Sequence, residues 1–426
     1  MKPKHPRWLV GLVLGTIVLG CTSPRVGAQH AGTFMGSIED PAIAYSTAPP
    51  HNVVADVNAK LLQGLVKFAF DPRSGFLQPA LDALQIPVDS QLLVFSRGSL
   101  QGKRIGEQNP RALFFNDRVA LGWVRGGNAL EVAAYDDSSG VVFYTLEQRA
   151  DAAAPLQFTR KFECLGCHVT GDTLGVPGLL MFSTTRAETG AFDGVPRHVD
   201  QSDPLERRFG GWFVTGYAGS VRHMGNNTAA VDGRATRELT SVDGLFDIDG
   251  YRTRSSDIVA HLVLTHQAGM TNLLARAAFE ARVAEESLRA SSTPAQATAV
   301  ATLMDGVAGE VVDHLLFVDE AKLSAPVRGT SGFAERFSAR GPRDRKGRSL
   351  YELDLTRRLM KYPCSYLIYS PGFDALPSLI KQPILRRLRE VLSGAKQDER
   401  YRVALSRTDR QAIVEILRDT KVDLGH

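Results

Sequence analysis

The sequence predicts an α+β protein with a β-rich N-terminal part, a loop-rich middle segment and a mostly α-helical C-terminal part. Runs of β-branched and aromatic residues, separated by turn residues, occupy much of the chain between residues 91 and 146. Glycine and proline punctuate residues 156–240, and apolar residues recur at helical spacing after residue 255. These patterns indicate a mixed β-rich domain at 40–155, a loop-rich segment at 156–240 and a helical region at 241–426.

The N-terminal part begins with a predicted helix over residues 53–70, which a turn at 71–75 ends. Strand-like runs follow at residues 91–96, 119–124, 130–135 and 140–146. Turn signals at residues 125–128 and 136–140 separate consecutive runs, so an antiparallel meander is expected.

The C-terminal part reads as a series of helices. A long helix is predicted from residue 255 to 286, and a second follows a polar break at 291–295 and ends near residue 317. Further helices are predicted at residues 349–361, 376–394 and 407–419.

The first 28 residues have the pattern of a secretory signal peptide. A basic stretch at residues 1–7 precedes an apolar run at 8–20, which is too short to span a bilayer, and small residues at 26–28 suit cleavage. The sequence Val18–Cys21 resembles a bacterial lipobox, so a lipid anchor at Cys21 is the alternative to cleavage after residue 28. Either route delivers the chain across the inner membrane to the periplasm or cell envelope.

The charge of the chain argues against nucleic acid as a partner. The first 28 residues carry four basic residues and no acidic ones, so the remaining chain has 46 basic and 46 acidic residues. No later segment is long and apolar enough to suggest a transmembrane span. A local charged surface for a redox partner protein is compatible with this balance.

The most specific motif is Cys164-Leu165-Gly166-Cys167-His168, a CxxCH sequence. In c-type haem attachment, the two thiols add to the vinyl groups of one haem and the histidine is the proximal iron ligand. A structural zinc site would need four ligands, and the remaining cysteines are Cys21 and Cys364, each without a nearby second cysteine. A thioredoxin-like pair would be expected beside a βαβ pattern, whereas a Gly/Pro-rich loop follows here. One covalently attached haem c is therefore predicted at Cys164 and Cys167, with His168 as proximal ligand.

The sequence leaves the second axial position open. Met224, 56 residues after His168 in a loop-like context, is the leading distal candidate, and His223 and His266 are alternatives. Arg208 and Arg222 are candidate partners of haem propionates, or else form surface salt bridges. An open sixth position would favour ligand binding or catalysis over electron transfer.

The chain resembles a family of exported bacterial proteins with one c-type haem, described as cytochrome c domain-containing. The segments that carry the resemblance run through most of the mature chain: Asn109–Asp117, Cys164–His168, Gly210–Trp212, Arg222–Asn226, Ser256–Val259, His266–Gln267, Gly329–Phe333 and Tyr362–Tyr369. The resemblance implies a haem protein of the periplasm or cell envelope that is larger than a simple carrier. It also implies that the part beyond the haem segment belongs to the same functional unit.

The leading interpretation is an exported mono-haem c-type cytochrome that transfers electrons. The alternatives are a haem c enzyme of peroxidase or oxidase type, which the length of the chain favours, and a haem-based sensor of a small ligand. No catalytic triad, P-loop or HExxH motif is recognisable in the sequence.

Overall fold

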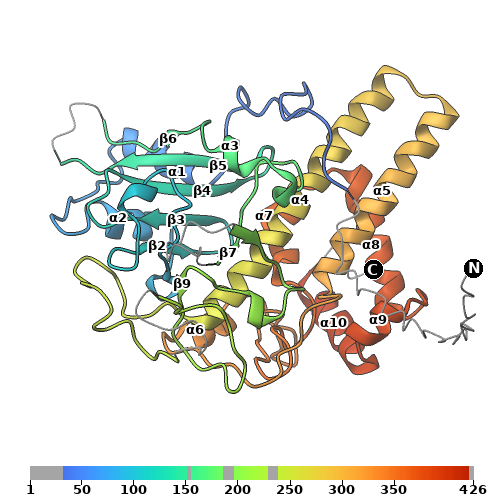
Figure 1. The fold of residues 1–426 in the computed structure, drawn as a ribbon. Coiled ribbons are helices and arrows are strands. Elements are labelled where there is room, and N and C mark those ends of the chain that lie inside the picture. Colours follow the sequence, from blue (N-terminus) through green and yellow to red (C-terminus); the bar gives the residue numbers. More distant parts are fainter. Residues whose placement is uncertain (1–31, 151–154, 186–195, 229–237, 422–426) are drawn as a thin grey trace, which may run out of the picture.

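The computed structural model describes residues 32–150, 155–185, 196–228 and 238–421. The predicted signal peptide and Cys21 lie outside these residues. A β-sheet and a group of long helices lie side by side, with the sheet at the left of Figure 1 and the helices at the right. The predicted α+β class, with a β-rich N-terminal part and a helical C-terminal part, is confirmed.

An antiparallel sheet forms the N-terminal part, in the strand order β6-β5-β4-β3-β2-β1-β9. The predicted meander is confirmed. Each of the four predicted runs contains a strand, and each of these strands pairs antiparallel with a strand that is adjacent to it in the sequence. The last strand, β9, comes from the loop-rich segment and pairs with β1. The strands of this sheet are β1 (Leu92–Val94), β2 (Arg111–Phe115), β3 (Val119–Trp123), β4 (Ala129–Asp136), β5 (Gly140–Glu147), β6 (Thr159–Arg160) and β9 (Trp212–Phe213).

The two faces of this sheet have different surroundings. Alternate residues of a strand point to opposite faces, and Leu130, Val132 and Ala134 of β4 are buried while the residues between them are only partly buried. The buried face packs on α1 (Val53–Leu62) and α2 (Leu77–Ala83) in one hydrophobic cluster. The other face is turned toward a large cavity, described below.

The predicted helix over 53–70 is shorter in the structure. The Asn52 side chain accepts hydrogen bonds from the amides of Val54 and Ala55 and so caps α1 at its start. The helix ends at Leu62, and Gly64 then adopts a positive φ of 69°. Leu62 and Leu65 are exposed, so continuing the helix would not bury them. Phe68 instead packs on Phe76 and Phe158 as part of a non-helical segment.

The helical part is built on α4 (Ile258–Ala290), which is capped by Asp257. The structure confirms the predicted long helices, and α5 starts at Pro294 directly after its Thr293 cap. The other helices are α3 (Leu165–His168), α5 (Pro294–Leu315), α6 (Phe333–Ala339), α7 (Pro371–Asp374), α8 (Ser378–Ser393), α9 (Glu399–Ala404) and α10 (Arg407–Thr420). Figure 1 shows α4 running beside the sheet, with α5 and α8 on its far side.

The predicted helix over residues 349–361 is wrong. This segment folds back on itself, with Leu353 paired antiparallel to Met360. The Asp354 carboxylate accepts hydrogen bonds from the amides of Thr356 and Arg357, and Leu355 has a left-handed φ of 58°. An aspartate that binds nearby backbone amides competes with helix formation, so a turn replaces the helix.

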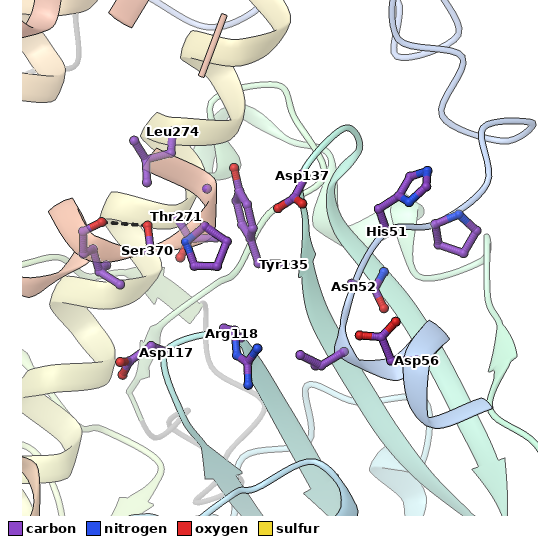
Figure 2. Close-up of a pocket in the computed structure, with 15 residues that line it drawn as sticks. His51, Asn52, Asp56, Asp117, Arg118, Tyr135, Asp137, Thr271, Leu274 and Ser370 are labelled. Atoms are coloured by element: carbon purple, nitrogen blue, oxygen red, sulfur yellow. Dashed lines mark hydrogen bonds between the residues drawn. The ribbon is translucent and has the colours of Figure 1, made fainter. Parts of the chain in front are cut away.

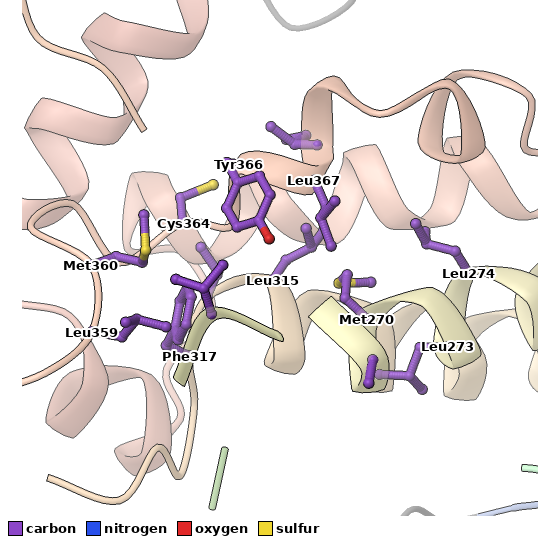
Figure 3. Close-up of a cluster of buried hydrophobic side chains, with 14 of the residues drawn as sticks. Met270, Leu273, Leu274, Leu315, Phe317, Leu359, Met360, Cys364, Tyr366 and Leu367 are labelled. Atoms are coloured by element: carbon purple, nitrogen blue, oxygen red, sulfur yellow. The ribbon is translucent and has the colours of Figure 1, made fainter. Parts of the chain in front are cut away.

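A hydrophobic cluster joins α4 to the C-terminal helices. Met270 and Leu273 of α4 belong to the same cluster as Phe317, Cys364 and Tyr366, which come from later parts of the chain (Figure 3). Cys364 is fully buried, and burial raises the pKa of its thiol to about 12. The same cluster includes Leu92 of the sheet and Phe209 of the middle segment, so the three predicted segments share a core. Within the described residues, no helix has both the length and the apolar character needed to cross a bilayer.

Candidate functional site

The CxxCH motif forms a single helical turn, α3, just after the edge strand β6. The amides of Cys167 and His168 both donate to the Cys164 carbonyl, at 3.1 and 3.0 Å. Residues three or four apart in a helix share a face. The turn therefore brings Cys164, Cys167 and His168 to the same side of the chain.

His168 is held in one orientation by the loop that follows it. Its Nδ1 lies 2.8 Å from the carbonyl oxygen of Gly178, and its ring lies 4.6 Å from the ring of Phe143. Because a carbonyl only accepts, Nδ1 carries the proton and Nε2 keeps a lone pair for a metal or another donor. Burial holds the pKa of His168 below its ordinary value, which keeps the ring neutral.

The position of Gly178 is set in turn by α4. The Asn272 side chain accepts from the amide of Leu179 at 2.7 Å and donates to the carbonyl of Leu179 at 2.9 Å. Asn272 is buried, with an exposed fraction of 2%. A residue of the C-terminal part therefore positions the carbonyl that orients His168.

Cys164, Cys167 and His168 line one cavity of about 510 Å³, which is within the range of small-molecule and cofactor sites. One wall is the less buried face of the sheet and another is formed by Leu264 and Ala268 of α4. Large side chains are missing from the middle of the sheet wall, where Ala120, Gly122 and Ala133 stand. The remaining lining residues are Arg97, Gly98, Ser99, Leu100, Arg111, Leu113, Glu131, Val132, Phe143, Tyr144, Thr145, Glu163, Leu179, Leu180, Met181 and Phe182.

The two cysteines are unlike a reactive redox pair. Cys164 is half-buried, and burial raises the pKa of its thiol to about 11, helped by the carboxylates of Glu163 and Glu131. A thiol with a raised pKa stays protonated near neutral pH, whereas redox-active CxxC motifs depend on a lowered pKa. Cys167 is exposed. In the parts of the chain that the structure describes, no three His, Cys, Asp or Glu side chains gather as a metal-binding group.

Met224, the leading distal candidate, does not line this cavity. Its sulfur lies 3.6 Å from the hydroxyl of Ser183 in β7 (Phe182–Thr184), a strand that pairs with β8 (Pro196–His198). Phe182 lines the cavity, and neighbouring residues of a strand point to opposite faces. Ser183 is likewise not among the lining residues, so Met224 contacts a residue outside the cavity wall.

The two alternative distal candidates also lie elsewhere. His266 is fully buried, with Nδ1 2.6 Å from the Gln201 side chain and Nε2 2.7 Å from the Ser365 hydroxyl. It is therefore bonded through both ring nitrogens. His223 accepts a hydrogen bond from the Gly225 amide, and burial lowers its pKa to about 4. Neither His266 nor His223 is among the residues that line the cavity.

The arginines considered for haem propionates have other positions. Arg208 is buried and donates to the backbone carbonyls of Asp203 and Gln201, at 2.7 and 2.8 Å. It is thus neither a residue of the cavity nor a surface salt bridge. Arg222 likewise does not line the cavity.

Sequence reasoning missed most of the residues that complete the cavity. Arg111, Glu131 and Met181 line it, and Asn272 supports it from α4. Arg111 belongs to the segment 109–117 that carries part of the family resemblance, and this was the one available signal for it. A strand assignment for that segment would have placed Arg111 on the same face as Leu113.

A second cavity of about 310 Å³ is lined by residues that lie further along β4 and α4 than those of the first cavity. Figure 2 shows Tyr135 and Asp137 at the end of β4, facing Thr271 and Leu274 of α4. Tyr135 is on the same face of β4 as Ala133 of the first cavity. The charged residues at this second cavity include Asp117, which is paired with Arg340 at 2.8 Å.

Comparisons of the chain with protein-family models, with curated proteins and with solved structures found no match. The site is therefore interpreted from its own geometry.

Proposed function

We propose that this chain is an exported c-type cytochrome that binds one haem through Cys164 and Cys167 and transfers electrons in the periplasm or cell envelope. The observation that carries the proposal is that both cysteines and His168 line the same cavity. A CxxCH motif that faced solvent, or whose residues pointed to different sides, would not suit a shared ligand. The cavity is also large enough for a cofactor.

The chemistry of the cavity fits a haem. Its walls carry aliphatic and aromatic side chains, among them Leu113, Phe143 and Leu180, which suit an apolar macrocycle. Small residues on β3 and β4 leave room beside the sheet for a planar ligand. The orientation of His168 leaves Nε2 as the metal-binding nitrogen, and the Gly178 carbonyl is the outer partner that haem-ligating histidines require.

Each residue then has a distinct role. Cys164 and Cys167 would hold the cofactor by thioether bonds, and His168 would be the proximal ligand. A bound haem supplies a one-electron redox centre. Gly178 and Asn272 orient His168, and the apolar walls exclude water. A redox partner protein would approach the exposed side of the cavity, where Cys167 lies.

The placement of Met224, His223 and His266 favours a second candidate function. Because none of them lines the cavity, the predicted distal ligands are not positioned for the iron. Met181 is the methionine among the lining residues. If Met181 does not bind iron either, the sixth position is open, and ligand binding or peroxidase- or oxidase-type catalysis becomes the better interpretation.

The first experiment tests covalent attachment. The chain is expressed with its export segment in a bacterium that matures c-type haem, and haem is detected on a denaturing gel. We expect haem on the wild type and on Cys364→Ala, a matched control outside the cavity, and no haem on the Cys164→Ser/Cys167→Ser variant. Haem that stays on the double variant would refute the proposal.

The second experiment separates the carrier from the enzyme or sensor. Carbon monoxide is added to the reduced protein, and its visible spectrum is recorded. A carrier with two strong protein ligands should keep its six-coordinate, low-spin spectrum. Rapid binding of carbon monoxide would end the carrier interpretation and favour an open site.

A further inference from the structure

The wall of the large cavity contains a partly buried cation that the CxxCH chemistry does not use. The Arg111 side chain is 17% exposed, and its Nη2 lies 2.9 Å from Glu131 Oε2. Its Nε is buried and has no hydrogen-bond partner among the described residues. A buried guanidinium N–H without an acceptor is costly, so an additional acceptor from a ligand would stabilise it.

Gly122 of β3 provides the room for this guanidinium. A Cβ at position 122 would lie 2.5 Å from both Nε and Nη2 of Arg111. The guanidinium therefore lies flat over a glycine inside the cavity, where any larger residue would push it aside. Arg97, which is exposed, lies at the rim of the same cavity.

Arg111 and the cysteines line the same cavity but belong to different parts of its wall. Cys164 follows β6, which pairs with β5, whereas Arg111 starts β2. In the sheet, β5 and β2 are separated by β4 and β3.

We propose that Arg111 binds a carboxylate of the molecule that occupies this cavity, and that this carboxylate is a haem propionate. The inference rests on the proposed function. The vinyl and propionate groups of haem lie on different sides of the macrocycle, so attachment at the cysteines directs the propionates away from the cysteines, along the sheet wall that carries Arg111. Arg111 supplies Nε–H and Nη–H donors in the fork geometry that matches a carboxylate, and Arg97 adds a second positive charge.

Glu131 limits this interaction. Its carboxylate shares the Arg111 guanidinium and also accepts hydrogen bonds from Ser99, at 2.8 and 3.0 Å, and from Gln101 at 3.2 Å. A propionate bound at Arg111 would therefore stand close to a second carboxylate. Removing the charge of Glu131 should strengthen propionate binding, which is the opposite of the effect of removing Arg111.

The test uses reversible binding to the full mature chain with Cys164→Ser and Cys167→Ser. The two probes are ferric protoporphyrin IX and its dimethyl ester, in which the carboxylates are capped. In this background, Arg111→Gln should weaken binding of the free acid about 10- to 100-fold and binding of the ester less than about 3-fold. Glu131→Gln should strengthen binding of the acid relative to the ester. The control Arg289→Gln, an exposed arginine at the end of α4, should change neither probe.

The proposal is overturned if Arg111→Gln weakens both probes equally, because Arg111 would then act only through the shape of the cavity. It is also overturned if neither probe is affected. If Arg111→Gln does not fold, the Glu131→Gln result decides, since equal binding of acid and ester there contradicts the shared-guanidinium arrangement. Covalent haem on the wild-type gel together with one of these negative results would leave the proposed function standing. A wild-type chain without covalent haem would refute both.

Discussion

Glu320 should make the stability of this protein fall as the pH rises through neutrality. Its side chain lies beside the buried Arg208 at the edge of the helical part, and Oε1 accepts a 2.9 Å hydrogen bond from the Leu359 amide. Burial raises its pKa from 4.5 to about 7, although the Leu359 amide and Arg208 oppose that shift. The folded protein therefore holds a proton on Glu320 at pH values where the unfolded chain has lost it.

The sign and size of the effect follow from this difference. Because the folded pKa is the higher one, the stabilising contribution is complete below pH 4.5 and is lost as the pH rises to about 7. A difference of one pKa unit corresponds to about 1.4 kcal/mol. The gap between 4.5 and about 7 thus makes the ionised carboxylate cost about 3 kcal/mol above neutral pH.

The perturbation that isolates this contribution is Glu320→Gln, which keeps an oxygen acceptor for Leu359 but cannot ionise. Urea unfolding followed by tryptophan fluorescence at pH 4.5 and pH 8 gives the free energy of unfolding of wild type and variant. Between these pH values, the variant should gain about 3 kcal/mol relative to the wild type. The exposed Glu335→Gln serves as the control. A Glu320→Gln difference that is the same at both pH values would refute the reasoning.

Three more predictions follow from single contacts. Asp257→Ala should lower the free energy of unfolding, measured by urea titration, by about 3 kcal/mol or more. The buried carboxylate of Asp257 caps α4 and also accepts hydrogen bonds from the amides of Thr330 and Ser331. An unchanged urea midpoint would contradict this. Met224→Ala should leave the visible and near-infrared spectra of the haem-loaded protein unchanged, because Met224 is not among the residues that line the cavity. Loss of a sulfur-to-iron band would show the opposite. His266→Ala should lower the free energy of unfolding by about 3 kcal/mol, since it leaves the buried side chains of Gln201 and Ser365 unpaired. Covalent haem should still be detected on a denaturing gel. A variant without haem would contradict the position of His266 outside the cavity.

Local patterns predicted much of the fold. The strand runs at 119–124, 130–135 and 140–146 were confirmed because alternating burial and turn residues act over a few neighbouring residues. The long helix after residue 255 was confirmed for the same reason. The segment 349–361 was mispredicted because the Asp354 side chain binds nearby amides, a contact that periodicity does not detect.

The residues of the candidate site also fall into two groups, those that the sequence identified and those that only the structure revealed. The CxxCH motif is local, and its cysteines and histidine were identified from spacing alone. The other wall residues come from β2, β4 and α4, which are far apart in sequence. Met224, His223 and His266 were selected by residue type and separation, and these properties do not tell which face of a strand or helix meets the cavity.

The sequence by itself determined the α+β class, the meander, the long helices and the residues that make a covalent haem site the leading prediction. Only the tertiary structure decided that Cys164, Cys167 and His168 share a cavity with Arg111 and Glu131, and that Met224 is not part of its lining. The physical reason is that a motif and a helix depend on contacts within a few residues. A cavity depends on which distant segments pack together, as when Asn272 of α4 fixes the loop that orients His168.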